Sequence, residues 1–413
     1  MNINDIYETN IIRFNNEGDG IASINNLLVF VKEALPKEKV KIKITDIKDN
    51  YALGEVIEVL SKSSDRVNPI CPYYEVCGGC NTMHMNYNLE LEFKKEKVKS
   101  IFKKISNIDI NIKEIISDIE YNYRNKVTLK VSNDNIGFYK EKTNEIINID
   151  KCFLVNNLIN EEIPKLKSFV SKYKDNNINE IMIRVISNKI MFSLDNINEH
   201  IKDEFINTFN YINSIYINNK LCLGEKYLEK EIDDLKFNIS PKSFFQVNDF
   251  ILSKMYAKAV SYIEPSDLTL DLYSGTGTIT SLVSKKSKNV IGIEVVKDAV
   301  NDANNNIRKN NINNIKFICD KVENKIDELR NENIDNIILD PPRSGSDKKS
   351  LKAILDINPK RIIYISCNPV TLARDYNLLK ENYTIKEITL FDMFPKTYHI
   401  ESLMVLERKW LWK

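Results

Sequence analysis

The sequence lacks any apolar run that approaches the length of a membrane-spanning helix, and its first five residues carry no signal-peptide pattern. These absences argue against a membrane protein and a secreted one, so we expect a cytoplasmic chain without a membrane partner. An excess of charge is also lacking, because 59 Lys and Arg oppose 58 Asp and Glu and leave a net charge of +1. Any nucleic-acid surface must therefore come from lysines that cluster locally.

Cysteines are present in an odd number, seven, and Cys71, Cys77 and Cys80 lie within ten residues of one another. In a cytoplasmic chain this crowding favours metal ligation over disulfide bonds. The two glycines between the last pair allow the backbone to fold tightly, so that the thiolates can converge on one centre. Cys152 is the natural fourth ligand. Four thiolates satisfy either zinc or an iron–sulfur cluster, and the spacing alone leaves this choice open.

Residues 1–62 alternate short strand-like runs with turns. This pattern predicts a small closed β-barrel of the OB kind, which often binds oligonucleotides but can equally be a structural cap. Residues 91–105 predict a helix that has Val98, Ile101 and Phe102 on one face and lysines over the remainder. Such lysines form either a solvated face or a face that contacts phosphates.

From residue 236 onward, strand-like runs alternate with helical segments, which is typical of a doubly wound, Rossmann-like α/β domain. The first strand is followed by a turn with Gly275 and Gly277, where the backbone can approach a ligand closely. The next strand ends at Glu294, whose carboxylate suits ribose hydroxyls, and the third ends at Asp320, an adenine contact. Residue 280 is threonine where a dinucleotide fingerprint has its third glycine, so the set fits S-adenosylmethionine better than NAD.

Residues 361–365 form a β-branched and aromatic run that predicts a buried strand. Pro369 breaks this strand and leaves Cys367 at its carboxyl end, where open α/β sheets hold their ligands. A buried free cysteine is the alternative. Near the last strand, His399 and Glu401 are two residues apart and so face one side of an extended segment. For Glu401 the alternative is an ordinary surface carboxylate.

With these motifs the chain resembles the RNA (uracil-5-)methyltransferases that have an amino-terminal TRAM domain and an iron–sulfur cluster, above all the members that modify 23S ribosomal RNA. The resemblance covers nearly the full chain. It implies a TRAM domain over residues 1–62, a small central α+β domain with the iron–sulfur site over 63–235, and an S-adenosylmethionine-dependent methyltransferase domain over 236–413. The implied partner is 23S rRNA, and we expect a monomer.

The resemblance also implies roles for single residues. It makes Cys367 the nucleophile and Glu401 the general base. It favours a [4Fe–4S] cluster over zinc, held by Cys71, Cys77, Cys80 and Cys152. The implied contacts to S-adenosylmethionine are Gln246, Tyr273, Gly275, Gly277, Glu294, Asp320 and Asp340.

Three other functions are weighed against this one. A methyltransferase of the tRNA T-loop is the nearest, but such relatives generally lack the TRAM domain and the cluster cysteines. An exocyclic-amine methyltransferase would favour an aromatic residue after the Pro-Pro pair and needs no cysteine, whereas this chain has Arg343 and Cys367. A non-catalytic iron–sulfur protein that binds RNA would have no use for Cys367 and Glu401 together.

Overall fold

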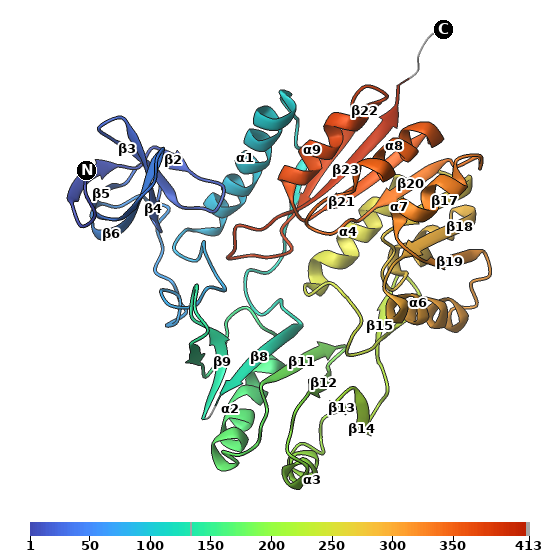
Figure 1. The fold of residues 1–413 in the computed structure, drawn as a ribbon, viewed down its shortest axis with the longest axis horizontal. Coiled ribbons are helices and arrows are strands. Elements are labelled where there is room, and N and C mark those ends of the chain that lie inside the picture. Colours follow the sequence, from blue (N-terminus) through green and yellow to red (C-terminus); the bar gives the residue numbers. More distant parts are fainter. Residues whose placement is uncertain (133, 410–413) are drawn as a thin grey trace.

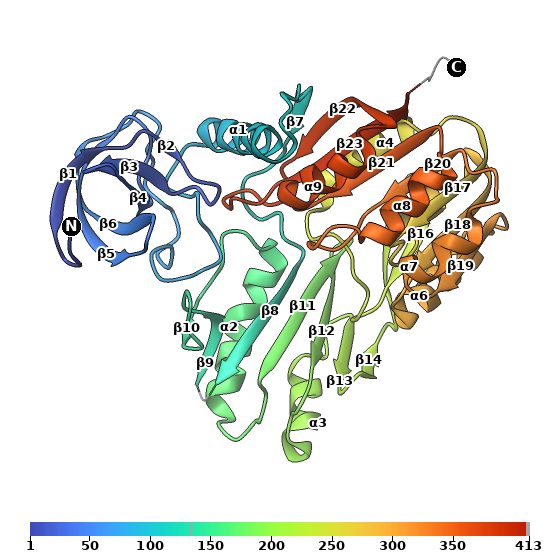
Figure 2. The same ribbon diagram turned by 45° about the horizontal axis from the view of Figure 1, so that its top comes forward.

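The structure is a computed structural model that describes residues 1–132 and 134–409. An amino-terminal barrel, a central sheet and a carboxyl-terminal α/β body meet around one centre, as Figure 2 shows. No helix within the described ranges is long and apolar enough to cross a membrane.

The amino-terminal residues form a six-stranded sheet in the order β1-β5-β6-β4-β3-β2, which curls into a small barrel (Figure 2). This agrees with the barrel that the sequence predicts. Alternate residues of each strand point inward, and Val29, Val31, Val40 and Ile42 are fully buried in its core. The strands are β1 (Ile6–Asn10), β2 (Arg13–Phe14), β3 (Gly20–Ile24), β4 (Leu27–Lys32), β5 (Lys39–Ile47) and β6 (Tyr51–Ser61).

The central part is a mixed seven-stranded sheet in the order β10-β9-β8-β11-β12-β13-β14. One face packs against α2 and α3 in a single apolar core. From the opposite face, Met182 and Met191 join the core of the carboxyl-terminal body. The elements are β8 (Lys126–Ser132), β9 (Asn135–Tyr139), β10 (Ile146–Asn148), α2 (Asn157–Lys172), β11 (Glu180–Ile186), β12 (Lys189–Leu194), α3 (Glu199–Thr208), β13 (Ser214–Ile217) and β14 (Lys220–Gly224).

The carboxyl-terminal body contains an eight-stranded sheet in the order β19-β18-β17-β20-β21-β23-β22-β7. Strands β17 to β21 are parallel, and β23 is antiparallel to β21. Helices cover both faces (Figure 1), and two separate apolar cores lie beneath them. The sheet is therefore doubly wound, as expected.

The elements of this body begin with a hairpin, β15 (Leu228–Ile232) and β16 (Leu235–Ile239), and then alternate. The helices are α4 (Asp249–Ser261), α5 (Thr278–Val283), α6 (Lys297–Lys309), α7 (Val322–Lys325) with a 3₁₀ turn at Ile326–Leu329, α8 (Lys348–Ile357) and α9 (Pro369–Leu379). The strands are β17 (Ser266–Leu272), β18 (Ser287–Glu294), β19 (Ile315–Cys319), β20 (Asn336–Leu339), β21 (Arg361–Ser366), β22 (Tyr383–Phe391) and β23 (Glu401–Arg408).

Helix α1 (Tyr87–Ser106) and strand β7 (Glu114–Ile116) pack with this last body rather than with the central sheet that follows them in the chain. Val98 and Phe102 of α1 are buried in its core, and β7 extends its sheet in parallel with β22. The domain boundaries drawn from the sequence remain a prediction, but residues 87–116 belong to the packing of the carboxyl-terminal body.

The lysines of α1 do not form one exposed face. Lys94 is fully buried, because its ammonium group lies between the carboxylates of Glu90 and Asp392. The sequence left open a solvated face or a phosphate-contacting face for the lysines of this helix, and the buried Lys94 belongs to neither. The ammonium group of Lys97 is partly buried as well, since its Nζ donates to the Tyr398 carbonyl at 2.8 Å.

Candidate active site

The carboxyl ends of the parallel strands border a cavity of about 910 Å³. It lies at the point where the chain, having built β18 and β19 on one side of β17, returns to build β20 on the other side. With the exception of Gly277, the residues predicted for catalysis and for the methyl donor line this cavity: Gln246, Tyr273, Gly275, Glu294, Asp320, Asp340, Cys367 and Glu401.

The turn between β17 and α5 has left-handed backbone at Tyr273 (φ 70°), Gly275 (φ 55°) and Gly277 (φ 74°). This conformation costs a residue with a side chain about 1–2 kcal/mol, and such strain gathers at functional sites. A Cβ on Gly277 would lie 2.6 Å from Phe317 Cζ, so Gly277 is required for packing beneath the cavity. Nothing lies within 4 Å of the position of a Cβ on Gly275, so the backbone there is open to a ligand.

Two carboxylates stand at the ends of β18 and β19. Glu294 accepts hydrogen bonds from the backbone N–H of Gly275 at 3.0 Å and of Val296 at 2.7 Å, which hold it beside the glycine turn. Asp320 accepts from the Asn324 side chain at 2.9 Å and from the Lys321 N–H at 2.7 Å. The bond from Asn324 is the main cause that lowers the pKa of Asp320, so this group stays ionised.

Strands β21 and β23 bring Cys367 and Glu401 to one end of the sheet. The strands are antiparallel with Ser366 opposite Ser402, so Cys367, which follows Ser366, and Glu401, which precedes Ser402, lie at the same end of the pair. Both side chains line the cavity. Glu401 is only 4% exposed, so it is not a surface carboxylate.

Burial and crowding of acids hold both groups in their protonated forms. Burial raises the pKa of Glu401 to about 8, and the charge of Asp340 adds to this rise, while Arg343 opposes it. Burial also raises the pKa of Cys367 to about 11, with a further rise from Glu401, and again Arg343 opposes it. Burial raises the pKa of Asp340 to about 7. A cation bound in this cavity would favour the ionised forms of these three groups.

The loop after β20 is tied to the turn that carries Cys367. The Asn368 side chain donates to the Arg343 carbonyl at 3.0 Å and caps α9 by accepting from the Val370 N–H at 3.1 Å. Thr371 donates to the same Arg343 carbonyl at 3.4 Å. These bonds hold the segment that carries Arg343 beside Cys367, whose pKa the charge of Arg343 lowers.

Tyr256 of α4 lines the same cavity and was missed by the sequence analysis. It is 9% exposed, and burial together with the charges of Asp340 and Asp271 raises its pKa. In the sequence it is one apolar position of an amphipathic helix, where an aromatic side chain is an ordinary core residue. No local sequence pattern distinguishes Tyr256, as a residue that lines the cavity, from an ordinary core residue.

A second cavity, of about 340 Å³, is lined by all four clustered cysteines, Cys71, Cys77, Cys80 and Cys152. Burial raises the pKa of each thiol. Within residues 1–132 and 134–409, however, no three His, Cys, Asp or Glu side chains stand close enough together to hold a metal ion. The structure therefore brings the four residues to one cavity, and ligation remains a prediction.

Residues 86–409 match the family described as tRNA (Uracil-5-)-methyltransferase, and residues 3–57 match the TRAM domain. The chain belongs to the tRNA (uracil-5-)-methyltransferase family. It is an RNA methyltransferase, and it is S-adenosylmethionine-dependent by its fold. An uncharacterized RNA methyltransferase of Clostridium acetobutylicum is 38% identical, over 98% of this chain and 97% of the relative. Another, from Caldanaerobacter subterraneus, is 37% identical over 99% of each.

Among solved structures of the family, the Pyrococcus abyssi tRNA (uracil-54, C5)-methyltransferase in complex with S-adenosyl-L-homocysteine is similar over 97% of this chain and 100% of its own. The TM-score is 0.80 at 26% identity. This match includes nearly the whole chain, so a TRAM domain alone does not separate enzymes that act on ribosomal RNA from those that act on tRNA.

Proposed function

We propose that this enzyme methylates C5 of a uridine in RNA, with 23S rRNA as its substrate. The proposal is carried by one observation: Cys367, directly after β21, and the buried Glu401, at the start of the adjacent antiparallel strand β23, line one cavity at the carboxyl ends of the parallel strands. A methyltransferase that acts on an exocyclic amine has no need of this pair.

The chemistry requires both groups because C5 of uracil is a poor nucleophile. The thiolate of Cys367 adds to C6, and the electron pair of the C5–C6 double bond moves into the ring as an enolate. C5 can then attack the electrophilic methyl group that S-adenosylmethionine supplies. Glu401 removes the proton that remains on C5, the double bond reforms, and the C6–sulfur bond breaks to release the thiolate. The target base must be unstacked to reach the cavity.

The cavity has the features that the methyl donor needs. We assign Gln246 and Tyr273, the open backbone at Gly275 and the carboxylates of Glu294 and Asp320 as its contacts. We also assign Asp340, whose charge raises the pKa of Cys367 and of Glu401. A bound sulfonium cation would favour the ionised form of Glu401, whose pKa is raised by burial and by the charge of Asp340. Gly277 is needed for packing against Phe317, and its contact with the methyl donor stays a prediction.

The raised pKa values predict that activity increases with pH. The base must be ionised to take a proton, and Glu401 loses its own proton only as the pH rises through about 8. The thiolate fraction of Cys367 increases in the same direction. We expect kcat/KM to rise between pH 6 and pH 9, measured by methyl incorporation into RNA, with no falling limb in that interval. A flat profile over this range would contradict the assigned electrostatics.

The RNA substrate is tested by mass mapping of 5-methyluridine in 23S rRNA and in tRNA from a strain that lacks the gene. We expect one or more 5-methyluridines to disappear from 23S rRNA and to return when the gene is restored. Loss from the T-loop of tRNA instead would establish the second candidate, which the similarity to the Pyrococcus abyssi enzyme favours. The TRAM barrel is the proposed RNA-binding part in either case.

We propose further that Cys71, Cys77, Cys80 and Cys152 hold a [4Fe–4S] cluster. All four residues line one cavity, and four cysteines are a complete ligand set for such a cluster. Protein purified without oxygen should contain iron and acid-labile sulfide and absorb broadly in the visible range. Cys80→Ala should lose this absorbance, whereas Cys222→Ala, a matched change outside the cavity, should keep it. Stoichiometric zinc without iron would overturn the assignment.

A further inference from the structure

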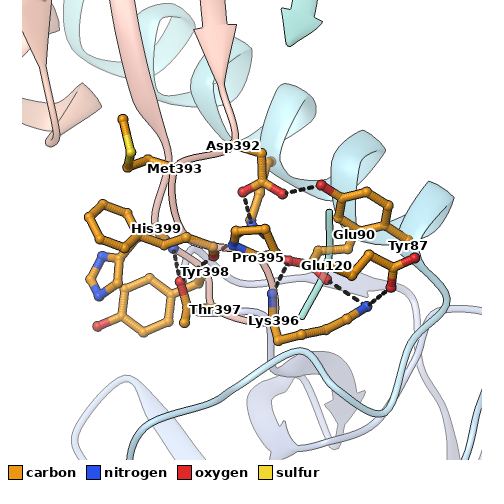
Figure 3. Close-up of polar contacts among 12 residues, drawn as sticks. Tyr87, Glu90, Glu120, Asp392, Met393, Pro395, Lys396, Thr397, Tyr398 and His399 are labelled. Atoms are coloured by element: carbon orange, nitrogen blue, oxygen red, sulfur yellow. Dashed lines mark hydrogen bonds and ion pairs between the residues drawn. The ribbon is translucent and has the colours of Figure 1, made fainter. Parts of the chain in front are cut away.

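The loop of residues 392–399, which joins β22 to β23, ends two residues before Glu401. It starts with a fully buried aspartate, Asp392. Lys94 Nζ of α1 lies 2.7 Å from Asp392 Oδ1 and 2.7 Å from Glu90 Oε1, and it donates to the Phe394 carbonyl at 3.2 Å. The Tyr87 hydroxyl donates to the second oxygen of Asp392 at 2.8 Å (Figure 3).

The middle of the loop is held by a second lysine. The Lys396 N–H donates to Glu90 Oε1 at 2.7 Å, so Glu90 bridges the two lysines. Lys396 Nζ lies 2.6 Å from Glu120 and 3.4 Å from Glu90 Oε2, and its side chain is 2% exposed (Figure 3). The charges of Asp392 and Glu90 outweigh the effect of burial and raise the pKa of Lys94, so this lysine stays charged.

Three other segments anchor the backbone of the loop. Asn248 donates to the Met393 carbonyl at 3.2 Å, and the Tyr123 hydroxyl donates to the Pro395 carbonyl at 3.0 Å. The N–H groups of Asn81 and Thr82 donate to the Lys396 carbonyl at 3.0 and 3.3 Å. Every one of these donors lies outside the sheet that carries the loop.

We propose that this buried network, Glu90, Lys94, Asp392 and Lys396, positions Glu401 for proton removal. The proposal rests on the role of Glu401 as general base. The network holds the loop from Asp392 to Lys396, and Asp392 directly follows Phe391, the residue of β22 that pairs with Glu401. Phe394 of the loop lines the catalytic cavity together with Glu401. Buried ion pairs give little net stability compared with apolar packing, but their directed hydrogen bonds select one conformation. Lys94 and Asp392 are therefore positioning residues, and neither lines the cavity.

The rates of methyl transfer and of C5 proton release, measured separately, distinguish a positioning role of the network from a merely structural one. Attack of the thiolate and transfer of the methyl group need no base, whereas release of the C5 proton does. A displaced Glu401 should slow only the second step, and a displacement of about 1 Å can cost on the order of 100-fold in rate. The ratio of the two rates does not depend on the fraction of folded enzyme.

The test is a single-turnover assay with saturating RNA that carries tritium at C5 of uridine and with a methyl donor labelled by carbon-14. For Lys94→Met we expect methyl transfer near the wild-type rate, tritium release slowed on the order of 10- to 100-fold, and a transient protein–RNA adduct on a denaturing gel. Tyr87→Phe leaves every charge paired, and it should give a smaller effect in the same direction. Lys202→Met, which breaks an exposed pair with Glu199 on α3, is the matched control and should keep the wild-type ratio.

An unchanged ratio of tritium release to methyl transfer in both Lys94→Met and Tyr87→Phe would overturn the positioning role. Failure of the proposed function has a different signature. In that case the wild-type enzyme would release no tritium, or Glu401→Gln would release it at the wild-type rate.

Discussion

Cys367→Ala should lose methyl transfer by on the order of 10⁴-fold or more, because Cys367 supplies the one thiol among the described residues that line the cavity. No covalent protein–RNA species should form with this variant. The measurement is incorporation of labelled methyl groups into RNA, followed by a denaturing gel. Cys319→Ala is the matched control, since Cys319 is exposed at the end of β19 and does not line the cavity.

Glu401→Gln should behave differently from Cys367→Ala. Addition at C6 and methyl transfer remain possible, but a neutral amide is a very poor base, and turnover should fall about 10²- to 10⁴-fold. The enzyme should accumulate as a methylated covalent adduct with its RNA. Wild-type enzyme should form such a band only with 5-fluorouridine RNA, because C5 then carries no proton that can be removed. Normal turnover of Glu401→Gln would transfer the role of base to another group, and His399 is the first candidate.

Lys94→Met should reduce the free energy of unfolding by about 3–5 kcal/mol, the usual cost of removing one partner from a buried ion pair. The side chains of Lys94, Glu90 and Asp392 are all 0% exposed. Without the ammonium group, two carboxylates remain close together away from water, and only Lys396 still lies near Glu90. The measurement is the midpoint of unfolding in urea.

The exposed pair of Lys202 and Glu199 gives the reference for this effect. Their side chains are 30% and 78% exposed, so Lys202→Met should change the stability by less than about 1 kcal/mol. If Lys94→Met lost no more free energy of unfolding than Lys202→Met, the predicted stabilisation of Glu90 and Asp392 by the Lys94 ammonium group would be wrong.

The sequence predicted those features that depend on local chemistry. The glycine turn after β17, the acids at the ends of β18 and β19, and the proline that ends the Cys367 strand each carry their signal within a few residues. Their convergence follows from parallel strands, whose carboxyl ends meet at one edge. The cavity at that edge therefore contains nearly every residue predicted for catalysis and for the methyl donor.

Features that depend on distant partners could not be predicted in this way. Lys94 looks like any other lysine of an amphipathic helix, and only the fold places Asp392 against it. Likewise, residues 114–116 extend a sheet whose other strands come from residues 266–408, and no local pattern indicates this. Tyr256 belongs to an apolar core and also lines the cavity, and its exposure to the cavity depends on the space that other elements leave unfilled.

The distant partners of the 392–399 loop also decide when the enzyme can become active during its synthesis. Asp392 lies 298 residues after Lys94, and the bonds from Tyr123 and Asn248 span 272 and 145 residues. Loops of this length close slowly, and a chain emerges from the ribosome beginning with its amino terminus. Lys94 and Glu90 can therefore bind Asp392 and Lys396 only after almost the whole chain has been made. The barrel and the central sheet can form earlier, so a nascent chain acquires the barrel, its proposed RNA-binding part, before it has the proposed base in place to complete the reaction.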